Sequence, residues 1–83
     1  MHDRSFPAYL ASTVRQRRRT LKLSQSELAE LAGCSTRLVH ALEAGKATLR
    51  LDKLIAVLRA LGIGLSLELP HDAVVGSTRG GAP

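Results

Sequence analysis

Residues 24–45 read SQSELAELAGCSTRLVHALEAG and contain the start and stop signals of two helices. Ser24 and Glu27 form a capping box, in which each side chain can bond the backbone N–H of the other, so a helix begins after Ser24. Gly33 suits the position after a helix C-terminus, where the backbone is often left-handed. Ser35 can then cap another helix. The stretch therefore predicts two short helices joined by a tight glycine turn.

The apolar residues of these two helices fall on one face of each. The inner face of the first helix consists of Leu28, Ala29, Leu31 and Ala32. The second helix covers about residues 36–44, ends at Gly45, and turns Val39 and Leu42 inward. Two helices at a steep angle around such a turn form a helix-turn-helix, which presents its second helix to the DNA major groove.

A basic helix is predicted before the motif, from about Pro7 to Lys22. Pro7 suits the first helical position, because its missing N–H would have no partner there. One stripe of this helix consists of Leu10, Val14, Arg18 and Leu21. Because an arginine on an otherwise apolar stripe cannot be left without a partner, Arg18 is expected to have a buried partner.

A leucine-rich helix is predicted after the motif, over about residues 49–61. It carries apolar residues at helical spacing, namely Leu51, Leu54, Ile55, Leu58 and Leu61.

The pattern then changes to strict alternation, with Ile63, Leu65, Leu67 and Leu69 on one face of a strand. A lone strand cannot satisfy its own backbone groups, so pairing with the same strand of a second chain is expected. The alternative is an extended tail that rests on the leucine-rich helix.

Length and composition indicate one small domain. The chain has 83 residues, one Tyr, one Phe and no Trp, so its core must be aliphatic. We expect a flexible arm over residues 1–6, the helix-turn-helix domain over 7–62, a dimerisation strand over 63–69 and a disordered tail over 70–83. Neither a signal peptide nor a membrane span is recognisable, which predicts a cytoplasmic, nucleoid-associated protein without membrane contact.

The sequence offers little for catalysis, a metal or a cofactor. Cys34 is the single cysteine, and its place after the glycine turn suits a buried structural residue. The three histidines, His2, His40 and His71, lack the spacing of metal ligands. An enzyme is therefore not expected.

The charge distribution favours a polyanionic partner. The net charge is +5, and five basic residues but no acidic one lie between Ser5 and Ser26. Such an excess suits DNA, although a solvated helix face that aids solubility would have the same composition.

With these elements placed, the sequence resembles the phage-repressor and Cro type of helix-turn-helix, the Xre family. The resemblance covers about residues 10–62. It rests on Arg18, on Ser24-Gln25-x-x-Leu28-Ala29-x-x-Ala32-Gly33, and on Val39-x-x-Leu42-Glu43-x-Gly45-Lys46. It implies a mainly α, lambda-repressor-like domain of four to five helices that binds double-stranded DNA. It also implies that the partner of Arg18 is Glu43.

The end of the chain is similar to the HipB-like antitoxins, because its leucine-rich helix runs into LGIGLSLEL at residues 61–69. This resemblance implies a homodimer held by the terminal strand, autorepression of an operon with an inverted-repeat operator, and a HipA-type kinase toxin as partner. The tail at residues 71–83 does not clearly match that subgroup. The alternative is a stand-alone phage or cellular repressor without a toxin.

Base contacts are expected from the second motif helix, whose N-terminal end enters the groove. Arg37 can donate two bonds to guanine O6 and N7. Thr36 can bond a base or touch a thymine methyl group, and Ala41 leaves room for one. His40 could reach a base or a phosphate, or could be an ordinary exposed polar residue.

Phosphate contacts are expected around these residues. The resemblance implies that Gln25 contacts a phosphate, and its place at a helix N-terminus suits an anion. Ser24 and Ser35 can each add a phosphate contact to their capping role. The basic candidates in the first helix are Arg15, Arg17, Arg19 and Lys22, of which Arg19 and Lys22 are the better placed. Lys46 follows the second motif helix and is another candidate.

Overall fold

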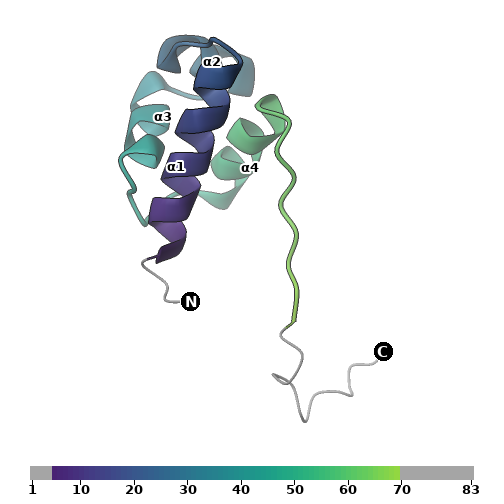
Figure 1. Ribbon diagram of the computed structural model, residues 1–83. Coiled ribbons are helices and arrows are strands. Elements are labelled where there is room, and N and C mark those ends of the chain that lie inside the picture. The colour runs from purple at the N-terminus through teal and green to yellow at the C-terminus, as the bar shows by residue number, and fades with distance from the viewer. Residues whose placement is uncertain (1–4, 70–83) are drawn as a thin grey trace.

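The structure is a computed structural model that describes residues 5–69. It contains four helices, which are α1 (Ser5–Thr20), α2 (Gln25–Ala32), α3 (Thr36–Glu43) and α4 (Leu51–Ala60) (Figure 1). Helix α2 packs against α3 and α4, and α1 packs against α3. The expectation of a mainly helical domain is confirmed, with four helices in the described residues. None of these helices combines the length and the hydropathy needed to cross a membrane.

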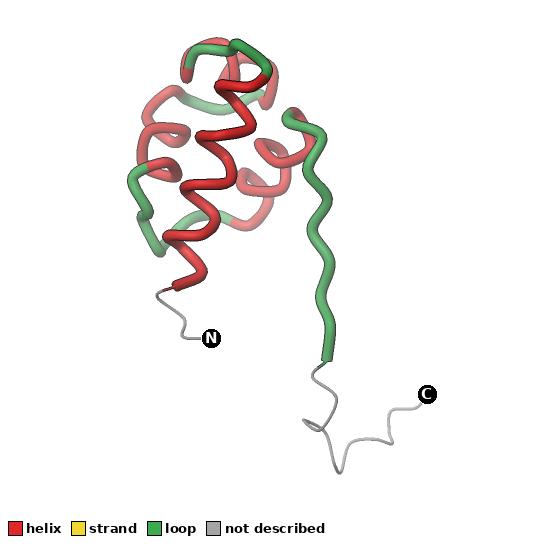
Figure 2. Tube along the Cα trace, in the orientation of Figure 1, coloured by secondary structure: helices red, strands yellow, loops and turns green. Residues whose placement is uncertain are grey.

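Residues 63–69 leave the helical bundle as an extended segment (Figure 2). The described part of this single chain contains no strand, because nothing in it pairs with the segment. The pairing expected with a second chain therefore stays a prediction. The expected tail and all but two residues of the expected N-terminal arm lie outside the described residues.

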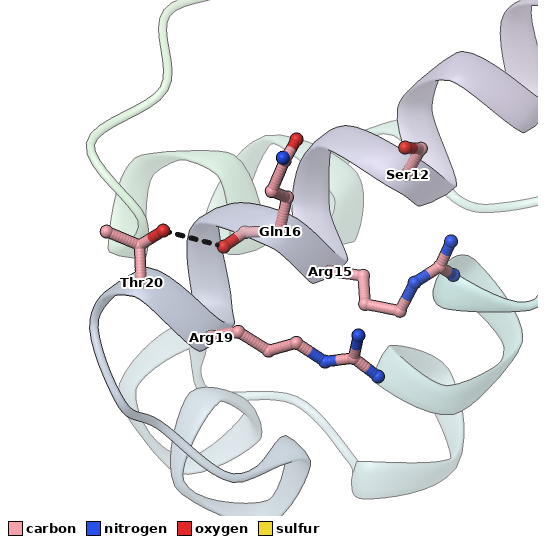
Figure 3. Close-up of a pocket in the computed structure, with 5 residues that line it drawn as sticks. All are labelled: Ser12, Arg15, Gln16, Arg19 and Thr20. Atoms are coloured by element: carbon pink, nitrogen blue, oxygen red, sulfur yellow. Dashed lines mark hydrogen bonds between the residues drawn. The ribbon is translucent and has the colours of Figure 1, made fainter.

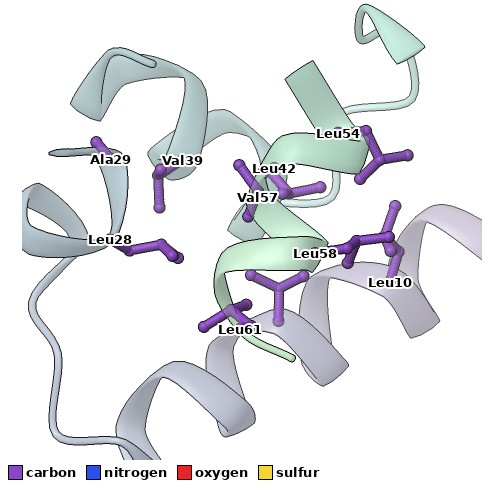
Figure 4. Packing of buried hydrophobic residues seen from close by; sticks show 10 residues of the cluster. Leu10, Leu28, Ala29, Val39, Leu42, Leu54, Val57, Leu58 and Leu61 are labelled. Carbon is purple, nitrogen blue, oxygen red and sulfur yellow. The ribbon is translucent and has the colours of Figure 1, made fainter. Parts of the chain in front are cut away.

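The core is aliphatic, as the composition predicted. Figure 4 shows side chains from all four helices meeting in one cluster. Six of its members are almost completely buried, namely Val14, Leu28, Val39, Leu42, Val57 and Leu61. Burial of such side chains is worth about 1.5–3 kcal/mol each. The core thus holds α2 and α3 on the α1 and α4 scaffold.

The caps of the two motif helices are confirmed. Ser24 Oγ accepts a bond of 2.9 Å from the backbone N–H of Glu27, whose carboxylate accepts one of 2.8 Å from the N–H of Ser24. Ser35 Oγ accepts a bond of 3.1 Å from the N–H of Leu38. Gly33 has a φ of 72°, the left-handed conformation that ends α2. These local signals fix where the turn between α2 and α3 lies.

The boundaries of α1 differ from the prediction. The helix begins at Ser5, so Pro7 is its third residue rather than its first, and Ser5 and Phe6 do not belong to an arm. All first-turn N–H groups lack intrahelical partners, so a proline is tolerated at that place too. The helix ends at Thr20, which leaves Leu21 outside the inner stripe with 40% of its surface exposed.

The prediction of a buried inner face is wrong for three residues. Leu31 of α2 and Leu51 of α4 are each 64% exposed, and Ile55 is 36% exposed. The apolar stripe of each helix is wider than its contact with the neighbouring helices, so only part of it is covered. In α4 the buried face is rotated toward Val57, which is fully buried.

Candidate nucleic-acid interface

Glu43, the last residue of α3, joins three helices. Its carboxylate accepts bonds from Arg18 of α1, with Nε 2.6 Å from Oε2 and a second nitrogen 2.9 Å from Oε1. Gln25 Nε2 of α2 donates to the same Oε1 at 3.1 Å. The structure thus brings together the ion pair that the resemblance implied. We call Glu43, Arg18 and Gln25 the Glu43 cluster.

The Glu43 cluster is shielded from solvent. The side chains of Arg18 and Glu43 are 11% and 4% exposed. Burial alone raises the pKa of Glu43. The hydrogen bonds from Arg18 and Gln25 and the charges of Arg18 and Arg15 outweigh burial, so the net pKa lies below its ordinary value. Glu43 is therefore a carboxylate at neutral pH, and it fixes the C-terminal end of α3 against α1 and α2.

Two further arginines of α1 hold helix ends. Arg15 donates to the backbone carbonyl of Glu43 at 2.9 Å, and Arg17 Nε donates to the carbonyl of Leu61 at 2.9 Å. Such contacts satisfy carbonyls that a helix C-terminus leaves free. Arg15 and Arg17, two of the basic residues offered as phosphate candidates, thus each use one nitrogen for a contact within the fold.

Arg19 remains available on the outer side of α1. Figure 3 shows Arg15 and Arg19 extending to the same side of the helix. Both line a shallow depression of about 460 Å³. The depression is lined by Ser12, Arg15, Gln16, Arg19 and Thr20. Within residues 5–69 the Arg19 side chain forms no ion pair, which leaves its charge free for an external anion.

The exposed side of α3 consists of the residues expected to read bases. Thr36, Arg37 and His40 are exposed, while Ala41 is half-buried beside them. Because Ser35 caps the helix, Thr36 and Arg37 lie in its first turn, the part that enters a groove in this motif. The next exposed residue is Ala44, which was not predicted from the sequence as a contact residue.

A hollow of about 280 Å³ lies between α3 and the loop that leads to α4. It brings together Arg37, Ala41 and Lys46, which are separated in the sequence. Thr48 and Arg50, which were not predicted as site residues, line the same hollow. In the sequence, Thr48 and Arg50 are marked only by their place in the polar, basic loop that follows the helix-turn-helix motif. Leu38 lines the same hollow and packs against the core.

The remaining phosphate candidates lie at the turns around α2. Gln25 is held by Glu43, so its amide is already oriented at the start of α2. Lys22 is exposed and has a φ of 60°, the only positive φ of a non-glycine residue in the described chain. A left-handed lysine is strained, and such strain often occurs at functional positions.

Cys34 and the described acidic and histidine residues offer no second site. Cys34 is half-buried against the core, and burial raises the pKa of its thiol. Within residues 5–69, no group of three or more histidine, cysteine or acidic side chains could hold a metal ion. His2 and His71 lie outside this range.

Comparison with known proteins identifies the family. A helix-turn-helix family model (HTH_3) matches residues 14–67, which run from the middle of α1 into the extended segment. A protein of Sinorhizobium fredii (strain NBRC 101917 / NGR234), described as the uncharacterized HTH-type transcriptional regulator y4mF, is 39% identical over 66 residues. The matched region is 80% of this chain and 87% of the relative. The chain therefore belongs to the helix-turn-helix family of the Xre type.

Proposed function

We propose that this protein is a sequence-specific, DNA-binding transcriptional regulator, acting as a repressor rather than an enzyme. The observation that carries the proposal is the exposed first turn of α3, where Thr36 and Arg37 stand beside the basic hollow. The Glu43 cluster supports it, because a recognition helix must be held rigidly to discriminate bases.

Within this proposal, base reading falls to the exposed side of α3. Arg37 donates to guanine O6 and N7 in the major groove, a contact worth about 1–3 kcal/mol of discrimination. Thr36 bonds a base or contacts a thymine methyl group, and Ala41 leaves space for one. His40, one turn after Thr36 and also exposed, extends the surface toward a base or a phosphate.

Phosphate contacts surround the reading surface. Gln25 and Ser24 meet the backbone at the start of α2, and Ser35 does so at the start of α3, where free N–H groups favour an anion. Arg19, Lys22 and Lys46 add positive charge. These contacts supply affinity and register but no sequence information.

The unit that binds DNA in this proposal is a homodimer. Leu65, Leu67 and Leu69 are 48%, 94% and 79% exposed in the single chain, and their burial requires a partner. A dimer with a two-fold axis reads an inverted repeat, with half-sites about 34–36 Å apart.

Two substitutions separate reading from anchoring. Arg37→Ala should reduce the preference for operator over random DNA about 30-fold or more, because it removes one base contact worth about 1–3 kcal/mol from each of the two protomers. Lys46→Ala should weaken both DNAs equally and lower the salt dependence by about two ions, one for each protomer of the dimer. Titrations of each variant at several salt concentrations measure both effects. Equal losses on the two DNAs for Arg37→Ala would exclude base reading by Arg37.

We further propose the antitoxin role implied by the HipB-like end of the chain. The support is the run from Leu61 to Leu69, which follows α4 as in that subgroup. The protein would then bind a HipA-type kinase and repress the operon that encodes both. Co-purification with the product of the neighbouring gene, and relief of that product's toxicity, test this role. A neighbour without kinase features would favour the stand-alone repressor.

A further inference from the structure

A second hollow lies on α4 at the root of the extended segment. It measures about 270 Å³ and is lined by Ile55, Leu58, Arg59, Ile63, Gly64 and Leu65. Its walls are aliphatic except for Arg59, the one charged side chain that lines it. The hollow therefore suits an apolar side chain that is accompanied by a negative charge.

The extended segment carries that combination. Leu67 and Leu69 are the most exposed large hydrophobic residues in the described chain, at 94% and 79%. Glu68 lies between them and is exposed. Within residues 5–69, neither Glu68 nor Arg59 forms an ion pair. Figure 1 shows the segment pointing away from the bundle, so it does not fold back onto its own α4.

Antiparallel pairing of two copies of residues 63–69 brings these features together. In an antiparallel ladder, the residue numbers of any two directly opposite residues have the same sum. The apolar residues of this segment all have odd numbers, so they face one another only when that sum is even. Complete overlap of all seven residues places Ser66 opposite Ser66 of the partner. Leu65 then faces the partner's Leu67, and Ile63 faces the partner's Leu69.

The same register also places the negative charge of the partner's Glu68 near Arg59. Gly64 lies directly opposite the partner's Glu68, and the Cα atoms of two such residues are about 4.5–5.5 Å apart. Gly64 and Arg59 line the same hollow, and a side chain at position 64 would meet nothing within 4 Å. Glu68 points to the face of the ribbon opposite Leu67. Because Gly64 carries no side chain and the space beside it is open, the flexible Arg59 side chain can extend past position 64 toward the partner's carboxylate.

We propose that this hollow is the docking site for a second copy of the chain, with the partner's Leu67 against its aliphatic wall and the partner's Glu68 paired with Arg59. The two-fold axis through Ser66 repeats both contacts, so the interface is self-complementary. The inference rests on the proposed homodimer and adds its register and its specificity contact.

A charge exchange tests the contact in the full chain. Arg59→Glu and Glu68→Arg should each raise the dimer dissociation constant about tenfold or more, because each places like charges together at two symmetric positions. The double variant Arg59→Glu/Glu68→Arg should restore the dimer to within a few-fold. Glu30→Arg, on the surface of α2, is the charge-matched control. Sedimentation equilibrium measures all four proteins beside the original.

The outcomes separate this inference from the proposed function. Dimers of equal strength in every variant would overturn the contact and leave the homodimer intact. Single-variant losses without rescue in the double variant would also overturn it. A monomeric original protein would contradict the homodimer itself.

A disulfide tests the register independently. In a Cys34→Ser background, Ser66→Cys should form an intermolecular disulfide readily, because the two residues face each other at the axis. Ser66→Cys without cross-linking, or faster cross-linking at Gly64→Cys, would overturn the register.

Discussion

Removal of the Glu43 carboxylate is the perturbation with the largest expected effect on the fold. Glu43→Ala deletes the acceptor for two nitrogens of Arg18 and one of Gln25. The Arg18 charge stays in place, because its remaining nitrogen still donates to the Leu23 carbonyl at 2.8 Å. The variant therefore has a buried cation without its anion.

Two estimates of the cost agree. Each buried donor left without a partner costs about 1–3 kcal/mol, and three donors lose theirs here. Removal of one member of a buried ion pair costs about 3–5 kcal/mol. A domain has about 0.05–0.15 kcal/mol of stability per residue. Glu43→Ala should therefore remove a large part of the free energy of unfolding, and DNA binding should weaken although Glu43 contacts no base.

Urea denaturation followed by circular dichroism at 222 nm measures this loss. The double variant Arg18→Met/Glu43→Leu should be less destabilised than Glu43→Ala, because no unpaired charge remains. Arg50→Gln is the control. It breaks the exposed pair between Arg50 and Asp52, whose side chains are 73% and 62% exposed, and such pairs contribute little.

A loss below about 1 kcal/mol for Glu43→Ala would refute the reasoning, because the cluster would then have no structural role. A double variant less stable than the single variant would show that packing rather than charge governs the site.

Three further predictions concern single residues. Because the folded-state pKa of Glu43 is lowered, its contribution is present at neutral pH and is lost as the pH falls below the ordinary glutamate value of about 4.3. Acid titrations of unfolding should therefore show a smaller decline for Glu43→Gln. Lys22→Gly should raise stability by about 1 kcal/mol in thermal melts, because it relieves the left-handed backbone. The same variant should bind all DNA more weakly, with a flatter salt slope. Arg17→Met should destabilise the protein by about 1 kcal/mol in urea titrations, because the Leu61 carbonyl loses its donor.

Local signals made much of the fold predictable. The capping box at Ser24 and Glu27 and the left-handed Gly33 depend on residues three to nine positions apart, and the structure contains both. The inner faces were less predictable. A stripe of leucines shows that one side of a helix is apolar, but neighbouring helices decide which part is covered. Leu31 and Leu51 are exposed for this reason.

The candidate site was also predictable only in part. Arg37 and Lys46 stand out in the sequence because they lie in and after the second motif helix. The hollow that joins them to Thr48 and Arg50 depends on the path of a loop. The bonds from Arg15 and Arg17 to backbone carbonyls 28 and 44 residues away leave no pattern in the sequence.

Selection of bound DNA from a random library tests sequence-specific binding by the dimer, because all sequences compete for the protein at once. If α3 reads bases in a two-fold dimer, the selected sequences should contain an inverted repeat with half-site centres about 34–36 Å apart, or one helical turn. Repetition with Arg37→Ala should blur the preferred bases within each half-site while the spacing stays. A library that shows no enrichment, or enrichment of a single half-site unchanged by Arg37→Ala, would contradict the claim.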